Sequence, residues 1–262
     1  MSAGAPIPAD IAAAIQAARP RLGLLASPIV FYSSIGSTND AAASLASEGA
    51  VVIAGEQTAG RGRRGRVWFS PPGSGLYVSV VLEPARARSD PLRATTLLTI
   101  AAGVAIAEGI DASAGLAVDL KWPNDVYVSE RKLAGILAEA THDTVVLGYG
   151  INLSAASYPA ELRDRATSLE SEIGRSVGRT SVLVETLAAL ARRYADLLDG
   201  RFDAILDAWR SLAPSAIGRG VRWTGASREQ SGVTVGIDDH GALLVRTDAG
   251  IERIVAGEVR WV

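Results

Sequence analysis

The chain has 262 residues, of which 48% are hydrophobic and 21% charged, an ordinary composition for a globular protein with a sizeable core. Its net charge is −2, so no global positive field would attract nucleic acid, and any anion must be bound locally. The absence of cysteine excludes disulfides, thiolate zinc sites and cysteine nucleophiles, and only two histidines argue against a histidine-rich metal site.

The first 28 residues are rich in alanine and proline and contain one predicted helix, at residues 10–18. They have neither the basic region nor the long apolar region of a secretory signal peptide. The longest apolar stretch, residues 97–107, ends at Glu108 and is too short to span a membrane. The sequence therefore predicts a cytoplasmic protein with a short N-terminal extension.

Residues 29–215 alternate between strand and helix patterns. Strands are predicted at residues 29–32, 51–54, 76–82, 116–121, 126–128, 132–139 and 144–153. Helices are predicted at residues 41–47, 91–109, 181–198 and 201–212. Ser37 or Thr38 can cap the first of these helices. Turn signals at residues 129–131 and 142–143 predict that the last three strands form an antiparallel meander.

The last 47 or so residues have an all-β pattern after Pro214 and the glycines of residues 218–220, which mark a predicted domain boundary. Strands are predicted at residues 221–223, 233–237, 243–247 and 259–262. A turn at residues 238–241 predicts a hairpin between two of them. Such short strands favour a small SH3-like barrel.

Residues 56–69, EQTAGRGRRGRVWF, are called the arginine loop here. Its arginines alternate with glycines, and no acidic residue lies between Gln57 and Phe69. Glycine lets the backbone approach a ligand closely, and the planar, charged arginine fork matches carboxylate and phosphate oxygens. Because Trp68 stands near the end of the segment, the arginine loop predicts a clamp for an anion that carries a flat ring.

Other interpretations fit the arginine loop less well. Residues 60–65 match G-x-G-x-x-G, but two prolines follow where a dinucleotide-binding fold needs a helix. A P-loop needs lysine and then serine or threonine after Gly65, where arginine and valine stand. RNA binding by an arginine-glycine segment remains open, although the chain is not basic overall. A solvated surface loop also remains open, but it would leave four arginines without local acidic partners.

Three further motifs follow downstream: KWPNDV at residues 121–126, RKLAGIL at 131–137 and GYGINL at 148–153. Each alone has a structural explanation, such as the type I turn that Pro-Asn-Asp favours. A lysine at the end of an apolar strand can bury its stem and aim its ammonium at a ligand, which singles out Lys121. Gly135, inside a predicted strand, indicates that a ligand or another backbone approaches closely.

These four motifs, in this order, closely resemble those of the biotin protein ligase family, and residues 37–39 resemble its biotin-contacting segment. The resemblance covers residues 29–262. It implies an α+β catalytic domain at residues 29–215, with a mixed sheet flanked by helices as in class II aminoacyl-tRNA synthetases, and an SH3-like domain at residues 216–262. It also implies the activity of a biotin–[acetyl-CoA-carboxylase] ligase, which makes biotinyl-5′-adenylate from biotin and ATP.

The resemblance assigns site residues by position. Those expected at biotin are Ser37, Thr38, Asn39, Gln57, Gly60, Arg61, Gly62, Arg63, Lys121, Gly135 and Ile136. Those expected at ATP or the adenylate are Arg61, Arg63, Arg64, Trp68, Lys121, Asn124 and Asn152. Catalysis is assigned to Lys121, Arg61 and Arg63, because cations must offset the repulsion between a carboxylate and the α-phosphate. Mg²⁺ is expected to bridge phosphate oxygens, with Asp125 as a candidate ligand.

The expected partner is a biotin carboxyl carrier protein domain of a carboxylase, one lysine of which receives biotin. No membrane is expected, and the chain is expected to be a monomer or weak homodimer. Some family members carry an N-terminal DNA-binding module, for which the residues before the first strand leave no room, so no operator binding is expected. The arginine loop is expected to be mobile when empty and ordered over the adenylate, because a reactive anhydride needs shielding from water.

Two alternatives stay open. A lipoate or octanoate ligase or transferase shares the catalytic architecture, although the arginine loop followed by KWPND is not expected there. An RNA-binding module could use the arginine loop and the barrel, but a near-neutral charge and only 5% aromatic residues argue against it.

Overall fold

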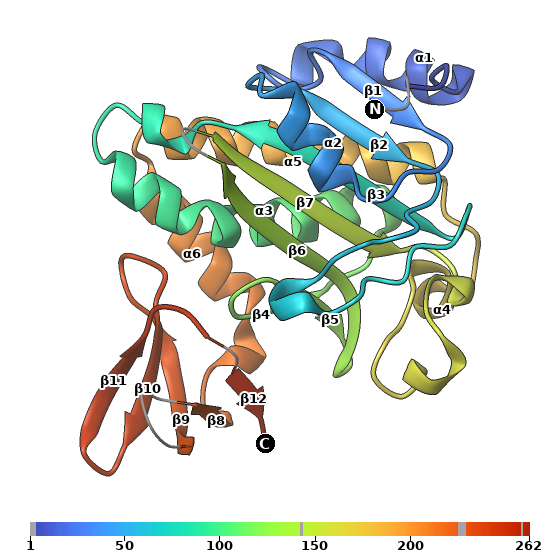
Figure 1. The fold of residues 1–262 in the computed structure, drawn as a ribbon. Helices are drawn as coiled ribbons and strands as arrows, with labels where there is room; N and C mark the ends of the chain where they lie inside the picture. Colours follow the sequence, from blue (N-terminus) through green and yellow to red (C-terminus); the bar gives the residue numbers. More distant parts are fainter. Residues whose placement is uncertain (1–3, 142–143, 225–228, 258) are drawn as a thin grey trace.

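A seven-stranded sheet runs through the larger part of the molecule (Figure 1). The structure is a computed structural model that describes residues 4–141, 144–224, 229–257 and 259–262, so the turn predicted at 142–143 lies outside the described residues. The strands are β1 (Ile29–Tyr32), β2 (Val51–Ala54), β3 (Gly75–Leu82), β4 (Asp119–Lys121), β5 (Asp125–Val128), β6 (Arg131–Thr141) and β7 (Thr144–Asn152).

The strands lie in the order β1-β2-β3-β7-β6-β5-β4. β1 and β2 are parallel, and every other neighbouring pair is antiparallel. The predicted mixed sheet is therefore confirmed. β4 is shorter than the predicted strand at residues 116–121, because the chain pairs with β5 only from Asp119 onward.

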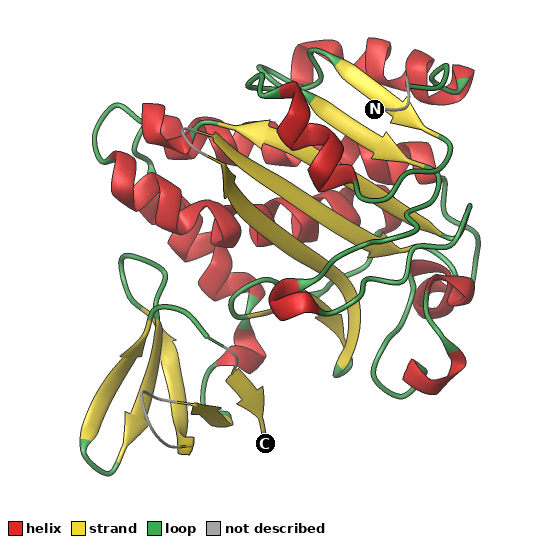
Figure 2. Ribbon diagram, in the orientation of Figure 1, coloured by secondary structure: helices red, strands yellow, loops and turns green. Residues whose placement is uncertain are grey.

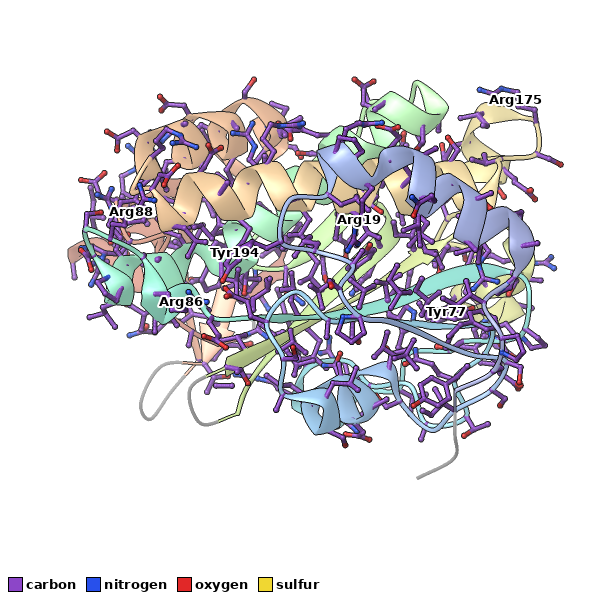
Figure 3. All side chains as sticks on the ribbon, turned by 90° about the horizontal axis from the view of Figure 1, so that it is seen from above. Arg19, Tyr77, Arg86, Arg88, Arg175 and Tyr194 are labelled. Carbon is purple, nitrogen blue, oxygen red and sulfur yellow. The ribbon has the colours of Figure 1, made fainter. Side chains whose placement is uncertain are left out.

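Helices cover both faces of this sheet (Figure 2). α3 (Pro91–Ala114) and α5 (Arg179–Leu198) pack together on one face, and Figure 3 shows the sheet between α5 and α2 (Thr38–Leu45). α3 continues past Gly109, where the sequence predicted its end. A Cβ at Gly109 would lie 2.6 Å from Cα of Thr186 in α5, so this glycine serves close helix packing rather than helix termination.

The apolar faces predicted for the two C-terminal helices are buried. They comprise Leu183, Leu187, Leu190, Tyr194 and Leu197 of α5, and Phe202, Ile205, Leu206 and Trp209 of α6 (Phe202–Leu212). Among the described residues, α3 is the one helix long and apolar enough to cross a membrane, but 72% of its apolar window is buried inside the protein. Its apolar surface is therefore used by the core. Two shorter helices are α1 (Ala9–Ala18) and α4 (Leu169–Ile173).

A second, five-stranded antiparallel sheet follows α6 (Figure 1). Its strands are β8 (Gly220–Thr224), β9 (Glu229–Ile237), β10 (Leu243–Thr247), β11 (Gly250–Ile254) and β12 (Val259–Trp261), in the order β11-β10-β9-β8-β12. The predicted hairpin turn at residues 238–241 joins β9 to β10. β11 was missed by the sequence analysis, because most of its side chains are exposed and its apolar pattern is weak.

The turn at residues 238–241 attaches this small sheet to the larger one. Nε1 of Trp122 donates to the carbonyl of Gly241 at 2.8 Å, and Nε of Arg93 donates to the carbonyl of Asp239 at 2.7 Å. Trp122 belongs to the turn between β4 and β5, and Arg93 to the first turn of α3. The small sheet is thereby held beside the end of β4 and β5.

Candidate functional site

The arginine loop (cyan in Figure 1) folds into a short hairpin. Trp68 N donates to the carbonyl of Gly60 at 2.9 Å, and Gly62 N donates to the carbonyl of Arg66 at 2.7 Å. The arginine loop is therefore self-paired in this structure, and its mobility when empty stays a prediction.

Arg61 is held by two acidic residues that come from other elements. Its guanidinium makes two hydrogen bonds of 2.7 Å to the carboxylate of Asp40 in α2, and a third of 3.1 Å to Glu139 in β6. The Arg61 guanidinium lowers the pKa of the Asp40 carboxyl. Because all three side chains are more than a third exposed, solvent screens these ion pairs, and they stabilise the fold by at most about 1 kcal/mol.

Arg63, at the hairpin tip, bridges the two sheets. Nη1 donates to Oδ1 of Asn124 at 3.2 Å, and Nη2 donates to the carbonyl of Gly257 at 3.4 Å. Asn124 is itself held, since its Nδ2 donates to the carbonyl of Ile136 in β6 at 2.7 Å. The neighbouring Arg64 is exposed and has a positive φ of 58°, which turns the chain at the tip. The tip therefore lies where the end of β4 and β5 meets the small sheet.

Two glycines that face each other across β6 and β7 form the floor under Trp68. Gly135 and Gly150 are register partners. A Cβ at Gly135 would lie 3.1 Å from Cζ3 of Trp68, and one at Gly150 would lie 2.5 Å from its Cε2. At Gly150 only glycine leaves room for the indole ring, and at Gly135 a side chain would press against it. The indole Nε1 is buried and has no hydrogen-bond partner among the residues that the structure describes.

A chain of hydrogen bonds joins the start of α2 to the arginine loop. Its members are Glu139, Asn39, Ser79, Thr38, Gln57 and Ser70. The links from Glu139 to Thr38 measure 2.6–2.7 Å, and Gln57 accepts from both N and Oγ1 of Thr38. Ser70 closes the chain by donating to the carbonyl of Trp68. The structure thus brings Thr38, Asn39 and Gln57 together and adds Ser79, which sequence reasoning missed because serine in a strand carries no signal.

Ser37 directly precedes α2 and is buried, but its side chain makes no capping hydrogen bond. Gly148 of β7 leaves the space that the Asn39 side chain occupies, since an added Cβ would collide with Oδ1 of Asn39. The glycines of the GYGINL motif therefore seat two different side chains, Asn39 and Trp68. Both seats lie on the face of the sheet that α2 covers.

Lys132, rather than Lys121, is the lysine beside Trp68. Its Nζ lies 5.3 Å from the centroid of the indole ring and 2.6 Å from Oδ1 of Asp125. Lys132 lies in the RKLAGIL motif, from which no role for it was predicted. Two adjacent basic residues at a strand start carry no signal that tells which one faces a ligand.

Lys121 points to the small sheet instead. Its Nζ lies 4.9 Å from the ring centroid of Tyr127 and 5.2 Å from that of Trp261. It lines a cavity of about 30 Å³ together with Asp119, Glu130 and Arg219 among others. The ammonium of Lys121 thus lies against Tyr127 and Trp261, although Lys121 pairs with Asp125, which in turn pairs with Gly135 of the floor under Trp68; its role in catalysis stays a prediction.

The structure also places two other predicted site residues, Ile136 and Asn152. The side chain of Ile136 is buried on the α3 side of the sheet, since its Cδ1 would lie 3.9 Å from a Cβ at Gly103 of α3. It lies on the opposite face of the sheet from Gly135, because successive strand residues point to opposite faces, and it lines a cleft that Arg63 also lines, so its assignment to biotin stays a prediction. Asn152 donates to the carbonyls of Thr167 and Lys132, at 2.9 and 3.4 Å, so it holds the backbone at Lys132.

The described residues contain no group of three or more histidine, cysteine, aspartate or glutamate side chains that could hold a metal ion. Asp125, the predicted Mg²⁺ ligand, is ion-paired with Lys132. One carboxylate already paired with a lysine does not form a metal site by itself. Magnesium commonly takes one or two protein carboxylates together with phosphate oxygens, so any such site here would have to be completed by a substrate.

An open cleft of about 560 Å³ adjoins the hairpin tip. It lies between α3, the turn at residues 122–124 and the turns of the small sheet, and Arg63, Asn124, His240 and Arg253 are among its lining residues. The cleft thus begins where Arg63 bridges the two sheets.

Comparison with known proteins relates this site to one family. Residues 32–154 match the biotin/lipoate A/B protein ligase family, and residues 216–260 match the biotin protein ligase C terminal domain. The chain is 38% identical to the bifunctional ligase/repressor BirA of Bacillus spizizenii over 242 residues, which are 88% of this chain and 73% of that protein. It is 37% identical to the biotin–[acetyl-CoA-carboxylase] ligase of Paracoccus denitrificans over 236 residues, 85% of this chain and 96% of that protein.

A solved structure resembles the whole fold. The biotin protein ligase of Aquifex aeolicus in complex with biotin and ATP superposes with a TM-score of 0.78 at 31% sequence identity. The superposition covers 89% of this chain and 98% of that one.

Proposed function

Because the chain belongs to the biotin protein ligase family, we propose that it activates biotin with ATP and transfers the biotinyl group to a carrier domain of a carboxylase. The observation that carries the proposal is the Trp68 ring, which lies on the floor of Gly135 and Gly150 with the ammonium of Lys132 beside it. Lys132 lies against Trp68, and Arg61 and Arg63 extend from the same hairpin. The match of residues 216–260 favours biotin over lipoate as the acid.

In the first step, a carboxylate oxygen of biotin attacks the α-phosphorus of ATP, and pyrophosphate leaves with the electrons of the broken P–O bond. Two anions must approach, so cations have to offset their repulsion and the charge that develops in the transition state. We assign to Lys132 the task of binding the reacting oxygens, because its ammonium lies beside the Trp68 ring and above Gly135 and Gly150. Asp125 would orient this ammonium through their ion pair.

Arg61 and Arg63 have different tasks in this proposal. Arg61 fixes the start of the hairpin to α2 and β6 through Asp40 and Glu139. Arg63 lines the open cleft, where arginine forks could bind the phosphates of ATP in two hydrogen bonds each. The buried Nε1 of Trp68 is a donor that a bound adenylate could satisfy, since a buried donor without a partner costs about 1–3 kcal/mol.

In the second step, the ε-amine of a carrier lysine attacks the carbonyl carbon of the mixed anhydride. AMP leaves with the electrons of the C–O bond, and the amine loses a proton to solvent. No covalent enzyme intermediate is required. The residues Thr38, Asn39 and Gln57 supply hydroxyl and amide groups that suit the ureido ring of biotin, and they are already held in one hydrogen-bonded chain.

Pyrophosphate release tests the proposal directly. The protein is incubated with ATP and Mg²⁺ and with either biotin or lipoate, and a purified carrier domain is then added and probed with streptavidin. Biotin-dependent pyrophosphate release followed by labelling of the carrier is the expected result. Release with lipoate alone would identify a lipoate ligase, and release with neither acid would refute the proposed activity.

Arg63→Gly is expected to let the adenylate escape, so that a bystander protein such as serum albumin becomes biotinylated. Loss of one hydrogen bond to a charged group costs about 1.5–3 kcal/mol, which corresponds to about 10- to 100-fold weaker binding of the adenylate. Arg63→Lys keeps the charge but loses the fork, so it should leak less. Streptavidin blots of the albumin measure the effect. An Arg63→Gly enzyme that still labels only the carrier would contradict the retaining role of Arg63.

A further inference from the structure

Each end of the arginine loop is held by a side chain from outside the loop. The hydroxyl of Tyr77 in β3 donates to the carbonyl of Pro71, just after the loop, at 3.0 Å. Nη2 of Arg179 in α5 donates to the carbonyl of Ala54, just before the loop, at 2.6 Å. The proposed function gives neither of these side chains a task.

Tyr77, labelled in Figure 3, lies in the same row of the sheet as the seat of Trp68. It is the register partner of Gly150, and directly paired strand residues point to the same face. Tyr77 is 1% exposed, and its ring lies over Gly75, where an added Cβ would lie 2.7 Å from Cε1 of the ring. A glycine thus makes room for this ring, as Gly150 does for the indole, and the hydroxyl reaches the turn that follows the arginine loop.

Arg179 is the first residue of α5, and the helix itself gives no reason for an arginine there. A cation is disfavoured at a helix N-terminus, where the peptide dipoles place partial positive charge. Its Nε is buried and has no hydrogen-bond partner in the part of the chain that the structure describes, which is unfavourable as well. What the side chain provides is its hydrogen bond to the carbonyl of Ala54, 125 positions away in the chain.

The two held ends meet at the foot of the hairpin. N of Gln57 donates to the carbonyl of Ser70 at 3.1 Å, which joins the strand that enters the loop to the strand that leaves it. Further along the hairpin, N of Trp68 donates to the carbonyl of Gly60 at 2.9 Å. A displacement of either end is therefore passed through backbone hydrogen bonds to Trp68.

We propose that Tyr77 and Arg179 are positioning residues for adenylate formation, which act by fixing the two ends of the arginine loop. Each acts through a backbone carbonyl and thereby sets where Trp68 stands on Gly135 and Gly150. The effect on the reaction rate rests on the proposed function. The fixing of the loop is a property of the chain and can be measured without any substrate.

Hydrogen exchange of backbone amides, followed by mass spectrometry on the full chain without substrates, tests the fixing. Tyr77→Phe keeps the ring and removes the hydroxyl, while the carbonyl of Pro71 retains a bond of 3.2 Å from Ser74. Exchange in a peptide that covers the arginine loop is expected to become about 3- to 10-fold faster, the effect of losing one neutral hydrogen bond. Tyr149→Phe is the matched control, because its buried hydroxyl contacts Thr186 of α5 at 3.2 Å, on the other face of the sheet.

Arg179→Met keeps an unbranched stem and removes the charged donor. Exchange in the same peptide is expected to become about 10- to 100-fold faster, because hydrogen bonds of charged donors are the stronger ones. Arg193→Met is the control on the same helix, since Arg193 pairs with Glu108 and Asp196. If Arg179→Met does not fold, Arg179→Lys replaces it, with an expected acceleration of about 3- to 10-fold because lysine keeps the charge but loses the planar fork.

The exchange data decide whether these residues fix the loop. Equal acceleration in Tyr77→Phe and Tyr149→Phe would show a general loosening of the fold and overturn the role of Tyr77. Unchanged exchange in a folded variant of Arg179 would overturn the role of that residue.

Biotin-dependent pyrophosphate release from the same proteins tests the link to the reaction. The rate is expected to fall by about 3- to 10-fold in Tyr77→Phe and by up to about 100-fold in Arg179→Met, because a displaced Trp68 misplaces the reacting groups. The two control variants should keep the wild-type rate. A wild-type rate in variants whose loop exchanges faster would overturn the positioning role. If the wild-type chain itself releases no pyrophosphate, the proposed function fails, and the exchange data still decide whether Tyr77 and Arg179 fix the loop.

Discussion

Replacing Lys132 with methionine is expected to slow adenylate formation by about 10²- to 10³-fold, the loss that follows removal of one group that stabilises transition-state charge. Methionine keeps an unbranched stem against Trp68 and removes the ammonium that lies 5.3 Å from the ring centroid. The measurement is biotin-dependent pyrophosphate release at saturating ATP. Thermal melting accompanies it, because Asp125 loses its partner in this variant.

Lys121→Met is the matched control for this experiment. It makes the same chemical change in a lysine that faces Tyr127 and Trp261. We expect the rate of adenylate formation to fall by less than about tenfold, because Lys121 does not contact the reacting atoms in the proposed mechanism. A large loss in Lys121→Met with a small one in Lys132→Met would restore the role that the sequence predicted for Lys121 and reject the assignment to Lys132.

Gly150→Ala is expected to lower the rate of adenylate formation by about 10²-fold, because a displaced binding surface misplaces the reacting groups. The added Cβ would lie 2.5 Å from Cε2 and 2.9 Å from Cζ2 of Trp68. Gly150 pairs with strands on both sides, through Tyr77 and Gly135, so the sheet cannot give way. The indole must move, and the hairpin of the arginine loop moves with it.

Gly103→Ala is the matched control, because it also replaces a glycine next to the same sheet but does not contact Trp68. A Cβ at Gly103 of α3 would meet Leu120 at 3.7 Å, an ordinary contact, so this variant should keep its rate and its melting temperature or gain slightly. Pyrophosphate release and thermal melting are measured for both variants. A Gly150→Ala enzyme with the wild-type rate would show that the Trp68 seat is not needed for adenylate formation.

The comparison of the two lysines shows why sequence reasoning identified the family but did not tell which lysine lies at Trp68. KWPND and RKLAGIL each contain a lysine at a strand boundary, and both motifs were recognised. Which ammonium reaches Trp68 depends on a register shift between β5 and β6, where Val126 pairs with Ala134 but Tyr127 pairs with Lys132. No local pattern reports such an irregularity, because it arises from the pairing of two strands.

The arginine loop leads to a similar conclusion. Its own residues contain no acid between Gln57 and Phe69, which made a free cationic clamp the natural interpretation. The partners of Arg61 come from α2 and β6, and one partner of Arg63 comes from the small sheet. These contacts join residues that are 21, 78 and 194 positions apart in the chain.

The sequence by itself determined the family and most of the strands and helices, because motifs in a fixed order and local apolar patterns can be followed along the chain; it also marked Gly135 as a position of close approach. Tertiary structure alone decided that Lys132 rather than Lys121 stands at Trp68, that Ile136 faces α3, and that the arginine loop is a pinned hairpin. The physical reason is that strand register and the meeting of distant charges are set by packing of the whole sheet, in which one residue of shift turns a side chain to the other face.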